Sequence, residues 1–293
     1  MTNIQIKRYE VLNPDQISAL HSLYNNNFDL LKMSKDNFAG KLLRNKNKIY
    51  FLLEADNGIP GYLITVNNSI LLLIVDEAYR QKGFGSELLR RGEEEIRTKH
   101  DKINLVAPGY FFCGVPLDTK SSYHKWFENR GFIHDWTAFD MVVDLENFTY
   151  KEEDFPCSLD GTIFRKLGKD KDEILSCYNG ANSIYDGWGN FYSGNNVDAI
   201  IAVKDREVIG GVILSSFCVF NESLKGAGGF GAIWVLKKYR EKGIGMKLYS
   251  KSLFELKNRG IKICHISYTH LDSWYGKLGA KKYIEYWIGD KKL

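Results

Sequence analysis

The chain has 293 residues, roughly twice the usual size of one domain, of which 44% are hydrophobic and 26% charged. This balance excludes a largely disordered protein, and a net charge of +4 is too small to predict a nucleic acid as the main partner. The longest purely apolar run, residues 70–75, is too short to span a membrane. The cysteines are odd in number and never form a C-x-x-C pair, so we expect a reducing, cytoplasmic location without disulfides.

The hydrophobic pattern predicts strands and helices around a glycine-rich turn. In chain order these are strand 4–11, helices 14–28 and 34–45, strands 48–55, 61–66 and 70–75, helix 85–99, strand 103–106, helix 122–129 and strand 136–143. The second half repeats this order from Thr162, after a charged linker at 146–156. We therefore predict two domains, 1–150 and 151–293, each of the α+β class with a mixed sheet.

A repeat supports this division, because residues 79–89 (YRQKGFGSELL) align without gaps with residues 239–249 (YREKGIGMKLY). A second repeated element, residues 123–132 and 271–280, predicts a short helix closed by a glycine and followed by a strand. Its offset is shorter by 12 residues, so the first half carries an insert, which we place at 107–122. That insert contains three consecutive aromatic residues, Tyr110, Phe111 and Phe112.

The repeated turn, Arg-x-x-Gly-x-Gly between a strand and a helix, is suited to binding a pyrophosphate. A helix N-terminus offers unpaired N–H groups and a partial positive charge, and glycines let the backbone approach an anion closely. Arg80 and Lys82 add charge in the first copy, as Arg240 and Lys242 do in the second. Neither copy continues into the Gly-Lys-Ser/Thr of a P-loop, and neither has the third glycine of a dinucleotide-binding fingerprint.

Residues 75–86 and 235–245 resemble the acetyl-CoA signature of the GNAT N-acetyltransferase superfamily, and residues 274–279 resemble its aromatic-Tyr-x-x-x-Gly helix. The resemblance covers nearly the whole chain, twice. It implies two tandem GNAT acyl-CoA N-acyltransferase domains, each a mixed, mostly antiparallel sheet flanked by helices. It also implies that acetyl-CoA is the cosubstrate and that a primary amine of a small molecule attacks it directly in a ternary complex.

The resemblance implies cofactor-binding residues in both copies. The strand before each turn would pair with the pantetheine arm and offer an N–H to the thioester oxygen, and the turn would hold the pyrophosphate. In the first copy these residues are Leu73, Ile74, Val75, Arg80, Gln81, Lys82, Gly83, Phe84, Gly85 and Ser86. In the second copy they are Ile233, Trp234, Val235, Arg240, Glu241, Lys242, Gly243, Ile244, Gly245 and Met246.

The copies differ where GNAT enzymes often carry the acid that protonates the departing thiolate. Four residues before the closing glycine, the second copy has Tyr275 and the first has Phe127. A phenol keeps its proton at pH 7 and can donate it, whereas phenylalanine cannot. We therefore predict that the second domain is catalytic and that Tyr275 is the acid; the alternative is that Tyr275 only packs in a core.

We expect the acceptor amine near residues 185–192 of the second copy, where Asp186 could pair with an ammonium group and Trp188 could cover it. A capping loop whose aromatic side chains fill a domain interface explains this stretch equally well. For the general base, Glu222, Asp272, a histidine (His265 or His270) and a chain of water molecules remain open.

Two other functions remain possible for a chain of this kind. One is a CoA-binding sensor or pseudoenzyme without transfer activity, and the other is an acetyltransferase that acts on a protein amine. Histidine spacing gives no metal motif, so we predict no metal, and we expect no membrane partner. The oligomeric state is left open.

Overall fold

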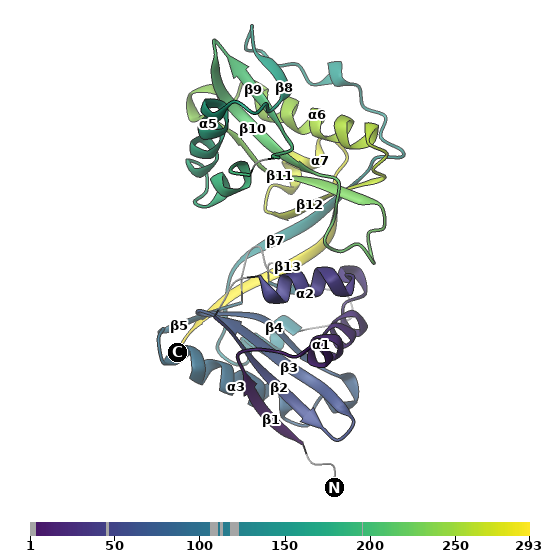
Figure 1. The fold of residues 1–293 in the computed structure, drawn as a ribbon, viewed down its shortest axis with the longest axis vertical. Helices are drawn as coiled ribbons and strands as arrows, with labels where there is room; N and C mark the ends of the chain where they lie inside the picture. Colours follow the sequence, from purple (N-terminus) through teal and green to yellow (C-terminus); the bar gives the residue numbers. More distant parts are fainter. Residues whose placement is uncertain (1–3, 45–46, 106–110, 112–113, 118–122, 195) are drawn as a thin grey trace.

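The computed structural model describes residues 4–44, 47–105, 111, 114–117, 123–194 and 196–293. The first half has a sheet with helices on both faces (Figure 1). Its strands are β1 (Gln5–Tyr9), β2 (Lys48–Ala55), β3 (Gly58–Val66), β4 (Ser69–Val75), β5 (Lys102–Asn104), β6 (Val115–Leu117) and β7 (Ile133–Asp144). Its helices are α1 (Pro14–Asn27), α2 (Lys35–Leu43), α3 (Phe84–Arg97) and α4 (Tyr123–Glu128), with short 3-10 turns η1 (Asp29–Leu31) and η2 (Glu77–Tyr79).

The second half repeats this arrangement after the 3-10 turn η3 (Glu152–Asp154). Its strands are β8 (Ile163–Lys166), β9 (Ala199–Lys204), β10 (Glu207–Ser215), β11 (Ala227–Val235), β12 (Ile263–Thr269) and β13 (Lys281–Lys292). Its helices are α5 (Lys171–Asn182), α6 (Ile244–Asn258) and α7 (Asp272–Gly276), with the 3-10 turns η4 (Trp188–Tyr192) and η5 (Lys237–Tyr239). The predicted order of elements is therefore present in both halves.

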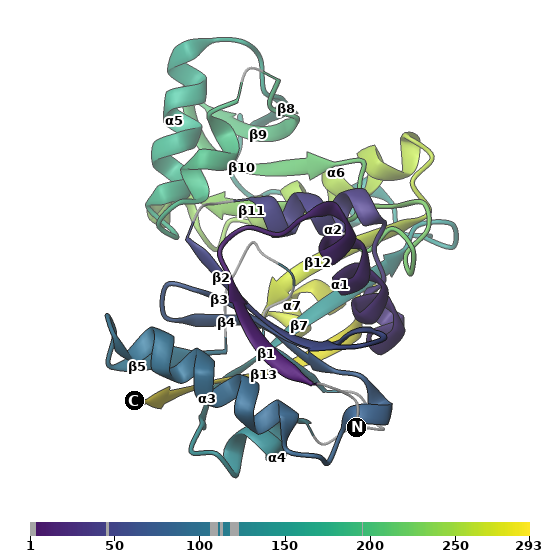
Figure 2. The same cartoon turned by 60° about the horizontal axis from the view of Figure 1, so that its bottom comes forward.

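Local sequence explains where the helices begin. Helix α1 starts with a capping box, in which Asn13 accepts from the backbone of Gln16 and Gln16 accepts from the backbone of Asn13, and Pro14 occupies the first helical position. Figure 2 shows α1 and α2 on one face of the first sheet and α3 on the other. The apolar side chains of these helices meet those of β2, β3 and β4 in the core.

The two halves share one continuous sheet. Among the described strands, the order is β1-β2-β3-β4-β5-β13-β7-β12-β11-β10-β9-β8, and β6 pairs with β13. The last strand of the chain, β13, therefore pairs with β5 and β7 of the first half, and β7 pairs with β12 of the second half. Figure 1 shows both strands crossing the waist of the molecule.

Each half therefore contributes a long strand to the sheet of the other half. A cut at residue 150 separates the two repeats along the chain, but it does not separate two sheets, because each half pairs with the other's long strand. The linker is also packed against the protein: Phe148 is buried, and Phe155 contacts the hydrophobic core of the second half. Periodicity shows which faces of a strand are buried, but not which neighbour its edges pair with.

Among the described strands, two neighbouring pairs are parallel, β4 with β5 and β11 with β12, so the sheet is mixed and mostly antiparallel in both halves, as predicted. Within the described residues, β4 and β5 pair only between Ser69 and Asn104. Beyond that point they diverge, and the edge of β4 is left facing a cavity described below.

A buried polar cluster joins the halves. Asp140 on β7 and His265 on β12 are 2% and 7% exposed, and the His265 Nε2 lies 3.2 Å from Asp140 Oδ2. The Tyr286 hydroxyl on β13 donates to the same carboxylate at 2.9 Å. Burial alone would lower the pKa of His265, but hydrogen bonds to Asp140 and Cys218 and the charge of Asp140 outweigh it and raise this pKa to about 10.

The insert of the first half was only partly anticipated. It contains β6, which the hydrophobic pattern did not predict because the strand has three residues. Phe111 is buried against Tyr24 and Phe38, whereas Tyr110 and Phe112 lie outside the described residues. Within the described residues, no helix combines the length and the apolar character needed to cross a membrane.

Candidate functional site

The two glycine turns have the same backbone conformation. Gly83 and Gly243 have φ angles of +87° and +80°, and Gln81 and Glu241, two residues earlier, have +60° and +63°. In each copy the first arginine of the turn folds back onto its strand: Arg80 Nε donates to the Val75 carbonyl at 2.9 Å, and Arg240 Nε to the Val235 carbonyl at 3.2 Å. The left-handed φ explains why glycine stands at this position in both copies.

Helices α3 and α6 begin at these turns without a side-chain cap. Within the described part of the chain, the N–H groups of residues 81–86 have no backbone acceptor. Unpaired amides and the positive end of the helix dipole together favour an anion at this place.

The turns differ in what lies against them. A Cβ placed on Gly83 meets no described atom within 4 Å, whereas one on Gly243 lies 2.5 Å from the Pro156 carbonyl oxygen. The Ser158 N–H donates to the Lys242 carbonyl at 3.0 Å and fixes the linker there. One side of Gly243 is therefore covered by the chain's own linker, whereas the same side of Gly83 meets no described atom.

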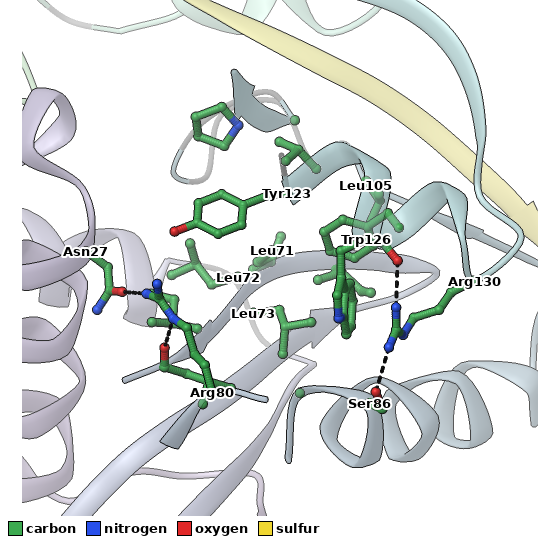
Figure 3. A pocket seen from close by; sticks show the side chains of 18 of the residues that line it. Asn27, Leu71, Leu72, Leu73, Arg80, Ser86, Leu105, Tyr123, Trp126 and Arg130 are labelled. Atoms are coloured by element: carbon green, nitrogen blue, oxygen red, sulfur yellow. Dashed lines mark hydrogen bonds between the residues drawn. The ribbon is translucent and has the colours of Figure 1, made fainter. Parts of the chain in front are cut away.

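A cavity of about 800 Å³ opens at the first turn, where β4 and β5 diverge (Figure 3). Its walls are the edge of β4, the turn, the start of α3, helix α4 and the end of α1. The polar and aromatic lining residues are Asn27, Phe28, Arg80, Gln81, Ser86, Tyr123, Trp126, Phe127 and Arg130. Two of these are arginines and none of the described residues that line it is acidic, so the cavity suits an anionic ligand with an apolar part.

The cavity arginines are held by neutral groups. Besides Val75, Arg80 donates to the side-chain oxygen of Asn27. Arg130 lies over the Trp126 ring at 3.7 Å and donates to the Ser86 hydroxyl and the Trp126 carbonyl, each at 2.8 Å (Figure 3). Their positive charge is left without a carboxylate partner among the described residues.

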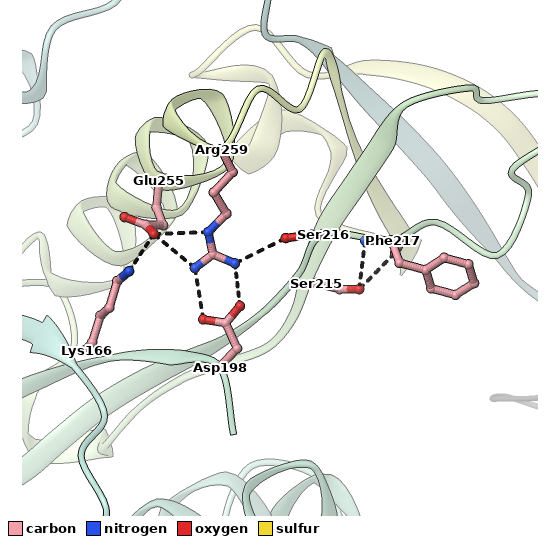
Figure 4. A network of polar contacts seen from close by, with 7 residues as sticks. All are labelled: Lys166, Asp198, Ser215, Ser216, Phe217, Glu255 and Arg259. Atoms are coloured by element: carbon pink, nitrogen blue, oxygen red, sulfur yellow. Dashed lines mark hydrogen bonds and ion pairs between the residues drawn. The ribbon is translucent and has the colours of Figure 1, made fainter. Parts of the chain in front are cut away.

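A structural arginine in the second half shows the contrast. Arg259, at the end of α6, binds both oxygens of Asp198 and also Glu255, which Lys166 contacts at 2.7 Å (Figure 4). Hydrogen bonds to Asp198 and Glu255 raise the pKa of Arg259 despite its partial burial. The charge of Arg259 is therefore neutralised by carboxylates of the protein itself, whereas Arg80 and Arg130 in the cavity can pair with the charge of an anionic ligand.

The helix before the closing glycine carries one phenol in each copy, one turn apart. The first copy has Tyr123 and Phe127, and the second has Leu271 and Tyr275 at the equivalent positions. Tyr123 is 39% exposed and lines the cavity, with its ring directed across it (Figure 3).

Tyr275, the predicted acid, is 6% exposed and belongs to the core of the second half. Its ring contacts Phe230, Tyr249 and Trp274, and burial raises the pKa of its hydroxyl. These surroundings are therefore those expected from the alternative stated above, in which Tyr275 only packs in a core.

Other predicted residues of the second copy are also packed. Trp234 is 2% exposed and fills the space beside Gly180 of α5, where an added Cβ would lie 2.3 Å from the indole ring. Trp188 packs on the same cluster and against Tyr185, and Asp186 is exposed. Neither Asp186 nor Trp188 is among the residues lining the cavity.

The candidate bases lie away from the cavity. Asp272 pairs with Lys282 at 3.1 Å, an interaction that lowers the pKa of the carboxyl group. His265 is buried in the cluster with Asp140, and His270 contacts the edge of Trp136. None of them is among the cavity's lining residues.

Sequence reasoning missed Asn27, Tyr123, Trp126 and Arg130 as residues of the site. One signal was available: Tyr123 precedes Phe127 by four residues, so both lie on one face of α4. Another was the residue before the closing glycine, which is Arg130 in the first copy and Leu278 in the second.

Comparison with known families agrees with the fold and the turns. Residues 12–108 match the family described as "Acetyltransferase (GNAT) domain", and residues 170–279 match the "Acetyltransferase (GNAT) family". The chain contains two GNAT domains. This tandem GNAT protein thus belongs to a family of acyltransferases. Each matched segment includes one glycine turn and the strand that leads into it.

Solved structures show the same fold over the whole chain. A glucosamine N-acetyltransferase region of a fungal multi-domain β-N-acetylglucosaminidase is 21% identical, with a TM-score of 0.84 over 99% of this chain, which spans 38% of that protein's length. A GCN5-related N-acetyltransferase from Sphaerobacter thermophilus is 15% identical (TM-score 0.70, covering 98% of this chain and 95% of that one). A tandem GNAT protein from the clavulanic acid biosynthesis pathway is 12% identical (TM-score 0.73, covering 99% and 98%). No curated protein sequence matches the chain.

Proposed function

We propose that the protein is an acetyl-CoA-dependent N-acetyltransferase whose cosubstrate binds in the first domain. The observation that carries this proposal is the difference between the turns: the one at Gly83 opens into a cavity whose described lining holds two arginines and no carboxylate, and the one at Gly243 has Pro156 against its glycine. The proposal moves the chemistry to the opposite half from the one that Tyr275 suggested.

The cavity fits both parts of acetyl-CoA. Free amides at residues 81–86, together with Arg80, suit the pyrophosphate. The apolar wall at residues 70–75, whose edge toward β5 has no strand partner beyond Ser69 among the described residues, suits the pantetheine arm. Backbone N–H groups along this edge can also stabilise the thioester oxygen as it gains negative charge.

Acetyl-CoA supplies an activated acetyl group. The neutral amine nitrogen forms a bond to the thioester carbonyl carbon, and the carbon–sulfur bond breaks. The sulfur takes a proton, which Tyr123 can give because its phenol lines the cavity. The proton lost by the amine passes to water, since no carboxylate or histidine is among the described residues lining the cavity.

A small acceptor fits the surroundings better than a protein. In a GNAT domain the stretch after the first helix borders the acceptor side. Here a loop of the second half covers that stretch: Asn221 accepts from the Ser34 N–H at 2.9 Å, and Ser223 accepts from the Lys32 N–H at 2.8 Å. The fungal neighbour is described as a glucosamine N-acetyltransferase, so glucosamine belongs in the first panel of amines.

Calorimetry with acetyl-CoA tests the assignment to the first half. We expect one molecule bound per chain. Lys82 and Lys242 are exposed at equivalent positions of the two turns, so Lys82→Glu and Lys242→Glu form a matched pair. Reversing a charge beside the pyrophosphate should weaken binding about tenfold for Lys82→Glu and leave Lys242→Glu unchanged.

Two molecules per chain, or loss of affinity in Lys242→Glu alone, would contradict the assignment. Release of thiol from acetyl-CoA with glucosamine, a polyamine or a lysine peptide then separates the possible functions. Binding without release for any amine would favour a CoA-binding module, and release with the peptide alone would favour a protein acetyltransferase.

A further inference from the structure

Two cationic groups lie at different places in the cavity. Arg80 stands at the start of the turn and contacts Val75 and Asn27, which belong to the ends of β4 and α1. Arg130 stands on the other side, after α4, and contacts Ser86 in the first turn of α3 (Figure 3). The two arginines therefore stand at opposite ends of the turn, Arg80 at its first residue and Arg130 beside Ser86.

Arg130 is built into its position. Its guanidinium lies on the Trp126 ring at 3.7 Å and is tied to the Trp126 carbonyl and the Ser86 hydroxyl. Because Ser86 accepts from Arg130, its own hydroxyl proton is free to be donated to an anion. Burial lowers the pKa of Arg130, so its charge is partly desolvated and gains from a nearby anion.

The second copy lacks this pair. Leu278 stands at the position of Arg130, and Met246 at that of Ser86. The covered turn has thus lost the cation and the hydroxyl together, while the glycines and the other basic residues of the turn are present in both copies. Fold alone therefore does not require Arg130 and Ser86.

We propose that Arg130 and Ser86 bind the ribose 3′-phosphate of CoA and make the protein select CoA over 3′-dephospho-CoA. The inference rests on the proposed function. The free amides and Arg80 already suit the pyrophosphate, and CoA carries one further phosphate, a monoester one ribose away. A monoester with about two negative charges near pH 7 is a good partner for a guanidinium with a hydroxyl beside it.

Calorimetry with CoA and with 3′-dephospho-CoA tests the proposal on the full chain. Because a hydrogen bond between charged groups is strong, wild type should bind CoA about 10- to 100-fold more tightly than 3′-dephospho-CoA. Arg130→Leu, which installs the residue of the second copy, should reduce this ratio to about one and leave the affinity for 3′-dephospho-CoA unchanged. Ser86→Ala should reduce the ratio by a smaller factor.

Each other outcome overturns the proposal in a recognisable way. Equal affinity of wild type for the two ligands shows that no 3′-phosphate site exists. An equal loss for both ligands in Arg130→Leu and in Ser86→Ala places these residues at the pyrophosphate instead. If wild type binds neither ligand, the proposed function itself has failed. Thermal unfolding shows whether each variant is folded. If Arg130→Leu does not fold, Ser86→Ala, at an exposed position at the start of α3, still tests the proposal.

Discussion

In the first half the turn at Gly83 opens into a cavity, while in the second half a turn with nearly the same φ angles lies against Pro156. The two turn sequences match the phosphate-binding pattern almost equally well. Only the second copy also has a tyrosine, Tyr275, where the family often carries its acid. The turns differ in two respects. Pro156 of the linker lies against Gly243, and Arg130 and Ser86 of the first copy are replaced by Leu278 and Met246 in the second. A signature therefore identifies a fold and a local conformation, and access decides whether a ligand can bind there.

The phenols give the largest expected effect. Tyr123→Phe should lower kcat and kcat/KM together by a factor of roughly 10² to 10⁴, because it removes an acid that acts only in the transition state. Tyr275→Phe should change neither by more than about twofold, since its hydroxyl lies in the core. Thiol release with the best amine of the panel measures both. Normal turnover by Tyr123→Phe together with loss in Tyr275→Phe would return the chemistry to the second half.

The junction between the halves gives the next effect. Asp140→Leu leaves the buried His265 without its partner and should lower the free energy of unfolding by about 3–5 kcal/mol. Because β7 and β13 link both halves, chemical denaturation should show this loss in a single transition. Asp135→Asn, an exposed position on the same strand, is the control and should change little. Two separate transitions in wild type would show that the halves fold independently.

The same pair predicts a smaller, pH-dependent effect. The pKa of His265 rises from an ordinary 6.5 to about 10 in the folded protein, so its stabilising contribution is complete below about pH 6.5 and is lost as the pH rises toward 10. Asp140→Asn removes the charge that holds this proton. The difference in unfolding free energy between wild type and Asp140→Asn should therefore shrink between pH 6.5 and 10. A difference that stays constant over this range would mean that His265 is not protonated in the folded state.

Much of the fold was readable from the sequence because it depends on local patterns. The repeat, the order of strands and helices and the two glycine turns follow from periodicity, from caps such as Asn13, and from the need for glycine at a positive φ. The turn residues of the candidate site were predicted for the same reason. Tyr123 and Arg130 were not, because they join the site from α4 and the segment after it, more than 35 residues along the chain from the turn.

The sequence by itself determined that this chain holds two GNAT domains with two glycine turns of one conformation. Only the tertiary structure decided that β13 completes the sheet beside β5, that Pro156 covers Gly243, and that the phenol facing the cavity is Tyr123. Backbone conformation is set by neighbouring residues and their hydrogen bonds. Strand pairing, the path of a linker and the exposure of a side chain depend on contacts between residues far apart in the chain, for which a single sequence contains no local signal.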